Sequence, residues 1–431
     1  MQKIQTSKLF VASCLSLLVT SLSFGIRAGM LGVEASHFQL DSAQIGSITA
    51  TAFYGFPIAV ILGGIIVDII GMKRLLLLAF IFHLLGIVLT IFANGYWTLF
   101  ISTFLIGIAN GTVEAACNPL VASLYTSNKT TKLNHFHLWF PAGIVIGTLV
   151  VFGLNHVLAS DSNNIPYWVS QVEIGVMLIP TLIYGYLFSK LDFPPTERVA
   201  AGISTGEMYK ALLNPLFIFM IICMFGTAIT ELFTNQWTDV FFRSVTNNAL
   251  LILTFVASMQ VLGRAFASPI VHRLAPQGVL LISAILSALG IYLLIHLHGD
   301  AIFFAAVIFG LGVAFFWPCM IGFVSENLPR TGAVGLNLMG GAGMFAVSIY
   351  MIFMGGYYDK LTQKHLPAGA NFADYVKAPA NSAMAQALGV AKDQAAPDVL
   401  NTTLIIPIIL IVAFAGLVIY MKTRSKKVLA S

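Results

Sequence analysis

The feature of this sequence that most constrains its fold is a succession of long apolar stretches separated by short polar segments. A helix needs about 20 apolar residues to cross the hydrocarbon core of a bilayer. Twelve stretches approach or exceed that length, near residues 9–30, 44–70, 75–93, 97–124, 136–158, 167–189, 214–241, 249–270, 278–297, 301–324, 333–356 and 402–421. A membrane-spanning β-barrel would alternate polar and apolar residues, which the run from Leu75 to Phe82 does not. The sequence therefore predicts an all-α membrane protein with twelve transmembrane helices.

The scarcity of charged residues excludes several classes of protein. Only 9% of the residues are charged and the mean hydropathy is +0.90, whereas a soluble domain carries about 25% charged residues. A cytosolic enzyme, a disordered scaffold and a secreted soluble domain are therefore excluded. The net charge of +5 comes without a basic stripe, so we expect no nucleic-acid partner. The expected partner of most of the surface is the lipid bilayer.

The distribution of lysine and arginine sets the expected orientation. These residues gather in the segments that face one side if both termini are cytoplasmic, and they are sparse on the other side outside residues 359–399. Cytoplasmic segments of membrane proteins carry an excess of Lys and Arg, and a long segment is translocated regardless of its charge. We therefore expect an integral protein of a bacterial inner (plasma) membrane, with both termini cytoplasmic.

Two polar segments divide the chain. Residues 190–213 separate the sixth and seventh apolar stretches, and we expect them to form a cytoplasmic linker. This linker would join one six-helix bundle at 1–189 to a second at 214–431. Residues 359–399 are rich in Ala, Pro, Asn and Lys, and we expect them to form an external loop before the last helix.

The two halves also share residues at a constant separation along the chain. The matching pairs are Gly64 and Gly263, Arg74 and Arg273, Gly111 and Gly310, and Pro119 and Pro318. Repeated halves in a protein with many membrane spans are typical of transporters whose substrate site lies near the bilayer midplane. The sequence thus predicts two pseudo-symmetric bundles around a shared site.

The segment after the second apolar stretch carries a motif. It reads Gly63-Gly64-Ile-Ile-Val-Asp68-Ile-Ile-Gly71-Met-Lys73-Arg74. This resembles the signature G-x-x-x-D-x-x-G-x-[KR]-[KR] of the loop between helices two and three in the major facilitator superfamily. A glycine at position 64 allows close contact between helices, and Gly71 permits a tight turn. We expect Gly64, Asp68, Gly71, Lys73 and Arg74 to stabilise one conformation without touching substrate.

A closer resemblance lies in the fourth and fifth spans. The fourth contains Gly-Thr-Val-Glu-Ala-Ala-Cys-Asn-Pro at 111–119, which is similar to the E-T-A-A-N-P stretch of the fucose–galactose–hexose proton symporter family. The fifth opens with Lys-Leu-Asn-His-Phe-His at 132–137, similar to the R-L-N-x-x-Q of that family. Trp317-Pro318 and the glycine-rich 340–343 fall at comparable places in the second half. The resemblance implies the major facilitator fold of two six-helix bundles.

The same resemblance implies roles for single residues. It makes Glu114 the protonatable carboxyl and places Asn118 and His137 at a sugar cavity. Fucose-type members carry an Asp in the first helix, close to where this chain has Ala28 preceded by Arg27.

The position of Glu114 supports a function independently of the resemblance. An ionisable side chain at the bilayer centre costs about 2.5–3.5 kcal/mol on insertion scales. Glu114 lies in the middle of its stretch and four residues before Asn118, which puts both side chains on one face of a helix. Removal from water favours the neutral carboxyl, so Glu114 could hold a proton in a closed site. The alternative is a structural carboxyl group that bonds a neighbouring helix.

Arg27 is a second charge within an apolar stretch, and three interpretations of it stay open. It could neutralise Glu114. It could face the cavity, where its planar guanidinium suits a carboxylate or vicinal hydroxyl groups of a substrate. It could also hold two helices together.

The seventh stretch carries a polar stripe. Glu231, Thr234, Asn235 and Thr238 recur at helical spacing. Hydroxyl-rich ligands need amide and carboxylate partners, and an aromatic ring against which the C–H groups of a sugar can pack. We expect the substrate-binding residues to include Arg27, Asn118, His137, Glu231, Asn235, Gln236, Trp237 and Trp317.

These features predict a secondary active transporter that carries a monosaccharide or a close derivative together with a proton by alternating access. One alternative is an organic-anion or sugar-acid carrier anchored by Arg27, and another is a sodium-coupled sugar carrier. A third alternative is a sensor built on a carrier fold without transport. The sequence has no H-E-x-x-H zinc motif and no phosphate-binding glycine loop, so we expect no enzyme activity, no metal and no cofactor.

Overall fold

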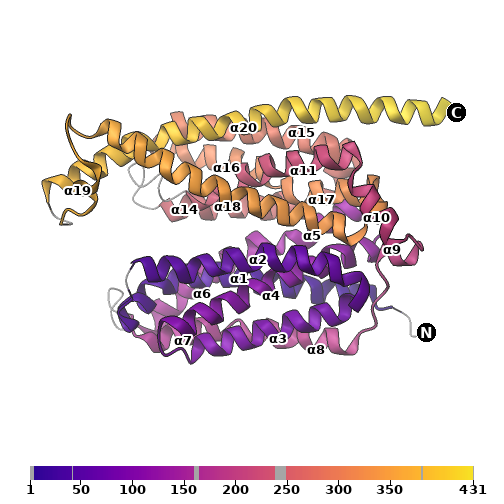
Figure 1. Cartoon of the computed structure of the whole chain (residues 1–431), viewed down its shortest axis with the longest axis horizontal. Helices are drawn as coiled ribbons and strands as arrows, with labels where there is room; N and C mark the ends of the chain where they lie inside the picture. The colour runs from indigo at the N-terminus through magenta and orange to yellow at the C-terminus, as the bar shows by residue number, and fades with distance from the viewer. Residues whose placement is uncertain (1–3, 41, 160–164, 238–248, 380–381, 431) are drawn as a thin grey trace. The chain divides into compact units, whose positions relative to one another are not determined.

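The computed structural model describes residues 4–40, 42–159, 165–237, 249–379 and 382–430, and every regular element in these ranges is a helix (Figure 1). The elements up to the linker are α1 Thr6–Phe38, α2 Ser42–Ile70, α3 Met72–Ile91, α4 Tyr96–Leu124, α5 Lys129–His137, α6 Trp139–Leu158, α7 Tyr167–Gly175 and α8 Leu178–Lys190. The linker holds α9 Glu197–Ala200 and α10 Thr205–Leu212. The later elements are α11 Pro215–Ala228, the π-helix η1 Ile229–Phe233, α12 Thr234–Gln236, α14 Ala249–Ala265, α15 Ala267–His296, α16 Ala301–Val313, α17 Phe316–Asn327, the 3₁₀-helix η2 Pro329–Thr331, α18 Gly332–His365, α19 Phe372–Val376 and α20 Ala383–Ala430.

The predicted spans are present. Among the described residues, eleven helical stretches are long and apolar enough to cross a membrane, and the shorter apolar helix at Ile252–Ala265 supplies a twelfth. Their ends follow the polar breaks in the sequence, and Gly71, with a φ of 86°, makes the turn between α2 and α3. The predicted all-α membrane fold is confirmed.

Prolines explain why three spans are each divided into two helices. A proline removes the hydrogen bond to the carbonyl four residues earlier, and its ring crowds that carbonyl. The breaks at Leu138, at 176–177 and at 314–315 come shortly before Pro141, Pro180 and Pro318. The breaks between α5 and α6, α7 and α8, and α16 and α17 are therefore encoded locally.

The eighth and ninth spans meet at a strained residue. Ala275 has φ 55° and ψ 163°, inside the range Ala267–His296 that is otherwise helical. The following Pro276 favours an extended ψ at the residue before it. A positive φ is costly for a residue with a Cβ atom. The predicted boundary between 249–270 and 278–297 is thus a backbone turn, although Ala stands where Gly would be relaxed.

Replacing Ala275 with Gly is expected to stabilise the protein by about 1 kcal/mol, because strain of this kind costs about 1–3 kcal/mol and added chain entropy offsets part of the gain. Thermal unfolding in detergent measures the effect. The matched control is Ala284→Gly inside α15, which should destabilise the protein by roughly 1 kcal/mol. A lower unfolding temperature for Ala275→Gly would contradict this view of the turn.

The segment 359–399 corrects one expectation. It was expected to form a loop, but α18 continues to His365, α19 lies within the segment, and α20 begins at Ala383. The segment is rich in alanine, which has the highest helix propensity of all residues, and this outweighs Pro397 inside α20. Its external position stays a prediction.

Contacts divide the chain into two compact units. The first unit holds Met1–Ile221, Arg264–Pro276 and Pro318–Met344, and the second holds Ile222–Gly263, Gln277–Trp317 and Phe345–Ser431. The first unit thus joins the predicted first bundle and the linker to short segments from later in the chain. The division into bundles at 1–189 and 214–431 stays a prediction.

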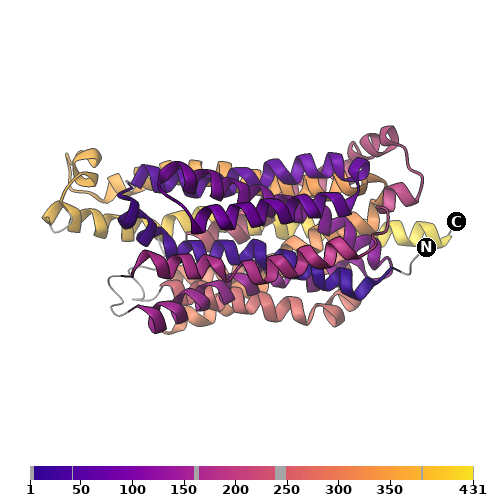
Figure 2. The same cartoon turned by 90° about the horizontal axis from the view of Figure 1, so that it is seen from below.

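Within the first unit, small residues let helices pack closely around α4. This helix contacts α1, α2 and α3, and Figure 2 shows the indigo and purple helices of the first part of the chain running alongside one another. A Cβ atom on Gly111 would collide with the carbonyl oxygen of Phe56 in α2. In α1, a Cβ atom on Gly25 would lie 2.7 Å from the carbonyl oxygen of Ile144 in α6. Such small-residue contacts are a common basis of helix packing in membranes, and the contact at Gly111 holds the helix that carries Glu114 against α2.

Candidate functional site

Three of the predicted site residues meet inside the first unit. Asn118 lies one turn after Glu114 on α4, and its Nδ2 donates to Glu114 Oε2 over 2.7 Å. His137, the last residue of α5, places Nε2 2.9 Å from Asn118 Oδ1 and Nδ1 3.8 Å from Glu114 Oε1. All three side chains are buried, with Glu114 only 3% exposed. We call Glu114, Asn118 and His137 the Glu114 cluster.

Hydrogen-bond directions in this cluster follow from the amide. Asn118 gives an N–H to the carboxylate, so its oxygen is the acceptor that faces His137. His137 must therefore donate from Nε2, which leaves Nδ1 facing Glu114 either as a lone pair or, in the charged imidazole, as a second N–H. The cluster can thus hold a proton on the carboxyl group or share it toward the imidazole.

Arg264, for which the sequence predicted no role, contacts the Glu114 cluster. Its Nη1 donates to the backbone carbonyl of His137 over 2.8 Å, and the side chain is 2% exposed. The carbonyl is available because Pro141, four residues later, has no N–H to offer it. This proline was the one local signal that His137 would need a donor from elsewhere. The guanidinium also interacts electrostatically with Glu114.

Arg27 has a carboxylate partner other than Glu114. It lies 3.9 Å from Glu34, seven residues later on α1, and both side chains are buried. The terminal nitrogens of Arg27 and both carboxylate oxygens of Glu34 find no hydrogen-bond partner among the described residues. The structure therefore separates Arg27 from the Glu114 cluster and pairs it within its own helix.

The predicted substrate residues of the second half belong to the second unit. Glu231 is buried and lies in η1, a π-turn of the kind that often marks functional sites. Asn235 follows in α12, and the Trp237 ring packs on Phe233 with centroids 5.0 Å apart. Trp317 is buried. The side chain of Gln236 and all of Thr238 lie outside the described residues.

The motif at the junction of α2 and α3 contacts the linker. Asp68 Oδ2 lies 2.5 Å from Arg198 Nε, and Asp68 Oδ1 accepts a bond from Thr196. Lys73 Nζ donates to the carbonyl oxygen of Leu191 over 2.9 Å, while Arg74 is exposed. Gly71 thus makes the turn, and Asp68 and Lys73 contact the linker. The conformational role of the motif stays a prediction.

Further contacts join the linker to the start of α5 and the end of α17. Lys129 Nζ pairs with Glu197 over 2.7 Å and donates to the carbonyl oxygen of Ser325 over 3.2 Å. The backbone N–H and the hydroxyl of Thr130 both donate to Glu326. These charged and polar contacts close the end of the first unit that carries the linker, which is the predicted cytoplasmic end.

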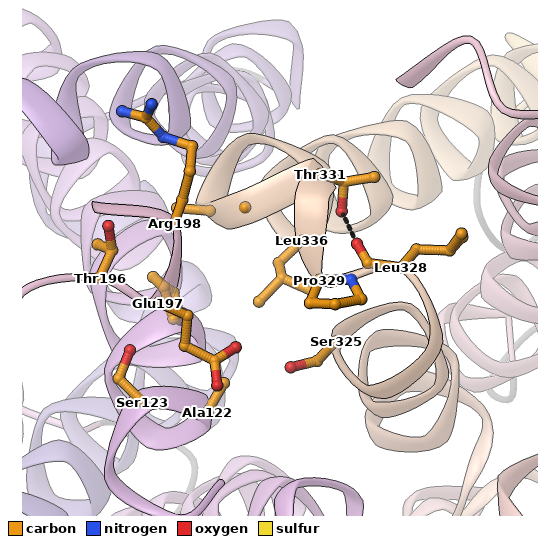
Figure 3. Close-up of a pocket in the computed structure, with 13 residues that line it drawn as sticks. Ala122, Ser123, Thr196, Glu197, Arg198, Ser325, Leu328, Pro329, Thr331 and Leu336 are labelled. Carbon is orange, nitrogen blue, oxygen red and sulfur yellow. Dashed lines mark hydrogen bonds between the residues drawn. The ribbon is translucent and has the colours of Figure 1, made fainter. Parts of the chain in front are cut away.

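A small cavity lies among these contacts. Figure 3 shows Thr196, Glu197 and Arg198 of the linker across from the Ser325–Leu336 segment. The hydroxyls of Ser123 and Ser325 find no partner in the described part of the chain. About 20 Å³ is open to a water molecule, which is room for about one water. The cavity can hydrate the closed end, but it is too small for a sugar.

Comparisons with known proteins place the fold. The family model of the major facilitator superfamily matches residues 10–362. The facilitated glucose transporter member 10 of Danio rerio is 26% identical over 171 residues, which is 40% of this chain and 32% of the relative. The D-xylose transporter of Levilactobacillus brevis is 26% identical over 156 residues, 36% of this chain and 34% of the relative. The matches thus span about a third of the length of these curated relatives.

Two solved structures are similar over nearly the whole chain. The transporter FucP in its outward conformation has a TM-score of 0.68 at 16% identity, covering 93% of this chain and 98% of FucP. The proton:xylose symporter XylE, bound to 6-bromo-6-deoxy-D-glucose, has a TM-score of 0.67 at 15% identity, covering 91% of this chain and 94% of XylE. At such identities the likeness shows the fold. Together with the family match, it establishes that the chain belongs to the major facilitator superfamily.

Proposed function

We propose that this protein is a proton-coupled symporter for a monosaccharide or a close derivative, working by alternating access. The observation that carries the proposal is the Glu114 cluster, a buried carboxyl group held by an amide and facing an imidazole. The named activities of the relatives add support, because they include glucose and xylose transporters. XylE, with a similar fold, is a proton:xylose symporter.

In the proposed cycle a proton from outside neutralises Glu114. The neutral carboxyl gains an O–H donor, and Asn118 and His137 become free to reorient their own polar groups toward sugar hydroxyls. After the site opens to the cytoplasm, water stabilises the carboxylate, and the proton leaves with the sugar. The proton is thus taken up on one side and released on the other, without any covalent change.

The sequence predicts further sugar-binding residues in the second half of the chain. The acceptors and donors for sugar hydroxyls would come from Glu231, Asn235 and Gln236. The aromatic surface for the sugar ring would come from Trp237 and Trp317. Buried polar groups matched to hydroxyls also give selectivity, since a ligand that lacks a hydroxyl leaves them unpaired.

The Arg27–Glu34 pair favours a neutral substrate over an organic anion. Glu34 already compensates the charge of Arg27, so the pair offers no net positive charge to anchor a carboxylate. Removing one partner of a buried pair leaves an uncompensated charge, whereas removing both is often tolerated. This difference separates a structural pair from a substrate anchor.

Changing Arg27 to Gln is expected to lower the free energy of unfolding by about 3–5 kcal/mol, and transport should fall with it. Adding Glu34→Gln should restore most of the lost stability and transport. Thermal unfolding and uptake by proteoliposomes measure both variants. If Arg27 instead anchored an anionic substrate, the double variant would fold but would still fail to take up substrate.

A counterflow screen of reconstituted protein tests the substrate class directly. Vesicles loaded with one unlabelled compound are given the labelled form outside, for a panel of neutral pentoses, hexoses and polyols and of the matching sugar acids. We expect exchange for at least one neutral sugar and none for its acid. Exchange of acids alone would overturn the proposal.

A further inference from the structure

Two prolines leave backbone carbonyls without a helical donor beside the Glu114 cluster. In a regular helix each N–H bonds the carbonyl four residues earlier, and proline has no N–H. Pro119 therefore cannot serve the carbonyl of Ala115, and Pro141 cannot serve that of His137. Ala115 directly follows Glu114, and His137 belongs to the cluster. Both free acceptors thus lie at the proposed proton site.

Side chains from much later in the sequence donate hydrogen bonds to both carbonyls. Asn337 of α18 donates its Nδ2–H to Ala115 over 2.9 Å, and Arg264 of α14 donates to His137 over 2.8 Å. Both donors are buried. An unpaired buried carbonyl costs free energy comparable to a lost hydrogen bond. Each donor therefore stabilises the folded protein by removing that cost.

The surroundings of Asn337 restrict its movement. A Cβ atom added to Gly64 would lie 2.6 Å from the Cβ of Asn337, so Asn337 fits closely against the motif glycine of α2. The same side chain therefore contacts the motif glycine and the helix of the proton site. Such a contact can persist only while the backbones stay close.

We propose that Asn337 and Arg264 are positioning residues that hold the Glu114 cluster in the conformation described here, through the carbonyls that Pro119 and Pro141 leave free. Both donors lie in the predicted second half of the chain and both acceptors in the first. Opening of the site toward the linker end therefore requires both hydrogen bonds to break.

The charge of Arg264 makes this opening depend on whether Glu114 is protonated. An ionised Glu114 attracts the guanidinium, and a protonated Glu114 does not. Loading the proton removes this attraction and so favours the open form. The link between protonation of Glu114 and opening rests on the proposed function, whereas the two hydrogen bonds and their effect on opening do not.

The test measures how readily the linker end opens, using a cysteine at Ser123→Cys, which lines the small cavity there. The four native cysteines are buried, and the parent chain corrects for their reaction. Labelling by a membrane-impermeant maleimide from the linker side should become about tenfold faster with Asn337→Ala or Arg264→Gln, the effect of losing one buried hydrogen bond. Arg264→Lys, which keeps the charge and a donor, should restore part of the difference, and exposed Arg273→Gln should change nothing.

A double-mutant cycle tests the role of the proline. Pro119→Ala supplies the missing N–H, so the Ala115 carbonyl no longer depends on Asn337. In that background we expect Asn337→Ala to speed labelling by less than about threefold, because interacting residues give non-additive effects. Circular dichroism and counterflow show whether each variant is folded.

Unchanged labelling in folded Asn337→Ala and Arg264→Gln proteins would overturn the proposal. So would fully independent effects of Pro119→Ala and Asn337→Ala. Labelling needs neither sugar nor a proton gradient, so faster labelling without any proton-coupled uptake would disprove the proposed function while leaving the positioning role in place.

Discussion

Replacing Glu114 with Gln is expected to abolish proton-driven sugar accumulation while leaving passive sugar exchange in place. The amide oxygen can still accept the hydrogen bond that Asn118 donates, so sugar affinity should change by less than about tenfold. An amide cannot bind or release a proton near neutral pH, and no proton can then travel with the sugar. The measurements are uptake under an imposed pH gradient and counterflow without one.

Glu173→Gln is the matched control for this experiment. Glu173 is also a buried carboxyl group of the first unit, on α7, and the substitution makes the same chemical change there. We expect this variant to accumulate sugar as the parent does. Sugar accumulation by Glu114→Gln, or its loss in Glu173→Gln alone, would assign the proton to another group.

Replacing Asp68 with Asn is expected to open the linker end of the protein. The change leaves Arg198 buried without its 2.5 Å carboxylate partner, and breaking a buried pair in this way costs about 3–5 kcal/mol. The cost applies to the closed form in which the pair exists, so the balance between closed and open forms should shift by a factor of about 10²–10⁴. Maleimide labelling at Ser123→Cys should accelerate accordingly, and net uptake should fall.

Two controls accompany this prediction. Arg74→Gln removes an exposed charge of the same motif and should have little effect, since exposed charges contribute about 0–1 kcal/mol. Exchanging the charges, with Asp68→Arg and Arg198→Asp together, should recover part of the closed form. Slow labelling in Asp68→Asn would show that the pair does not hold the linker end closed.

The membrane spans could be predicted because their signal is local. Long apolar stretches leave the backbone no partner in lipid except itself, which enforces helices, and Pro141 and Pro276 mark a break and a turn within a few residues. Residues 359–399 misled the prediction because proline and polar residues suggested a loop, while alanine favours helix whether or not the segment is buried.

The site was predictable only in part. The proximity of Glu114 and Asn118 follows from their spacing of four on one helix, and His137 was identified through the family resemblance. Arg264 and Asn337 were missed because a proline reveals that a carbonyl is free but not which distant side chain bonds it. The pairing of Arg27 with Glu34 was missed because the two residues are seven apart on α1, whereas helical spacing predicts contacts between residues three or four apart.

Proton movement during sugar entry tests the central claim most directly. Purified protein is reconstituted in liposomes without ion gradients, a transported sugar is added outside, and a pH indicator reports the external medium. A symporter draws protons inward with the sugar, so the medium should become alkaline in the parent protein and stay unchanged with Glu114→Gln. Sugar entry in the parent protein without any change in external pH would contradict the account.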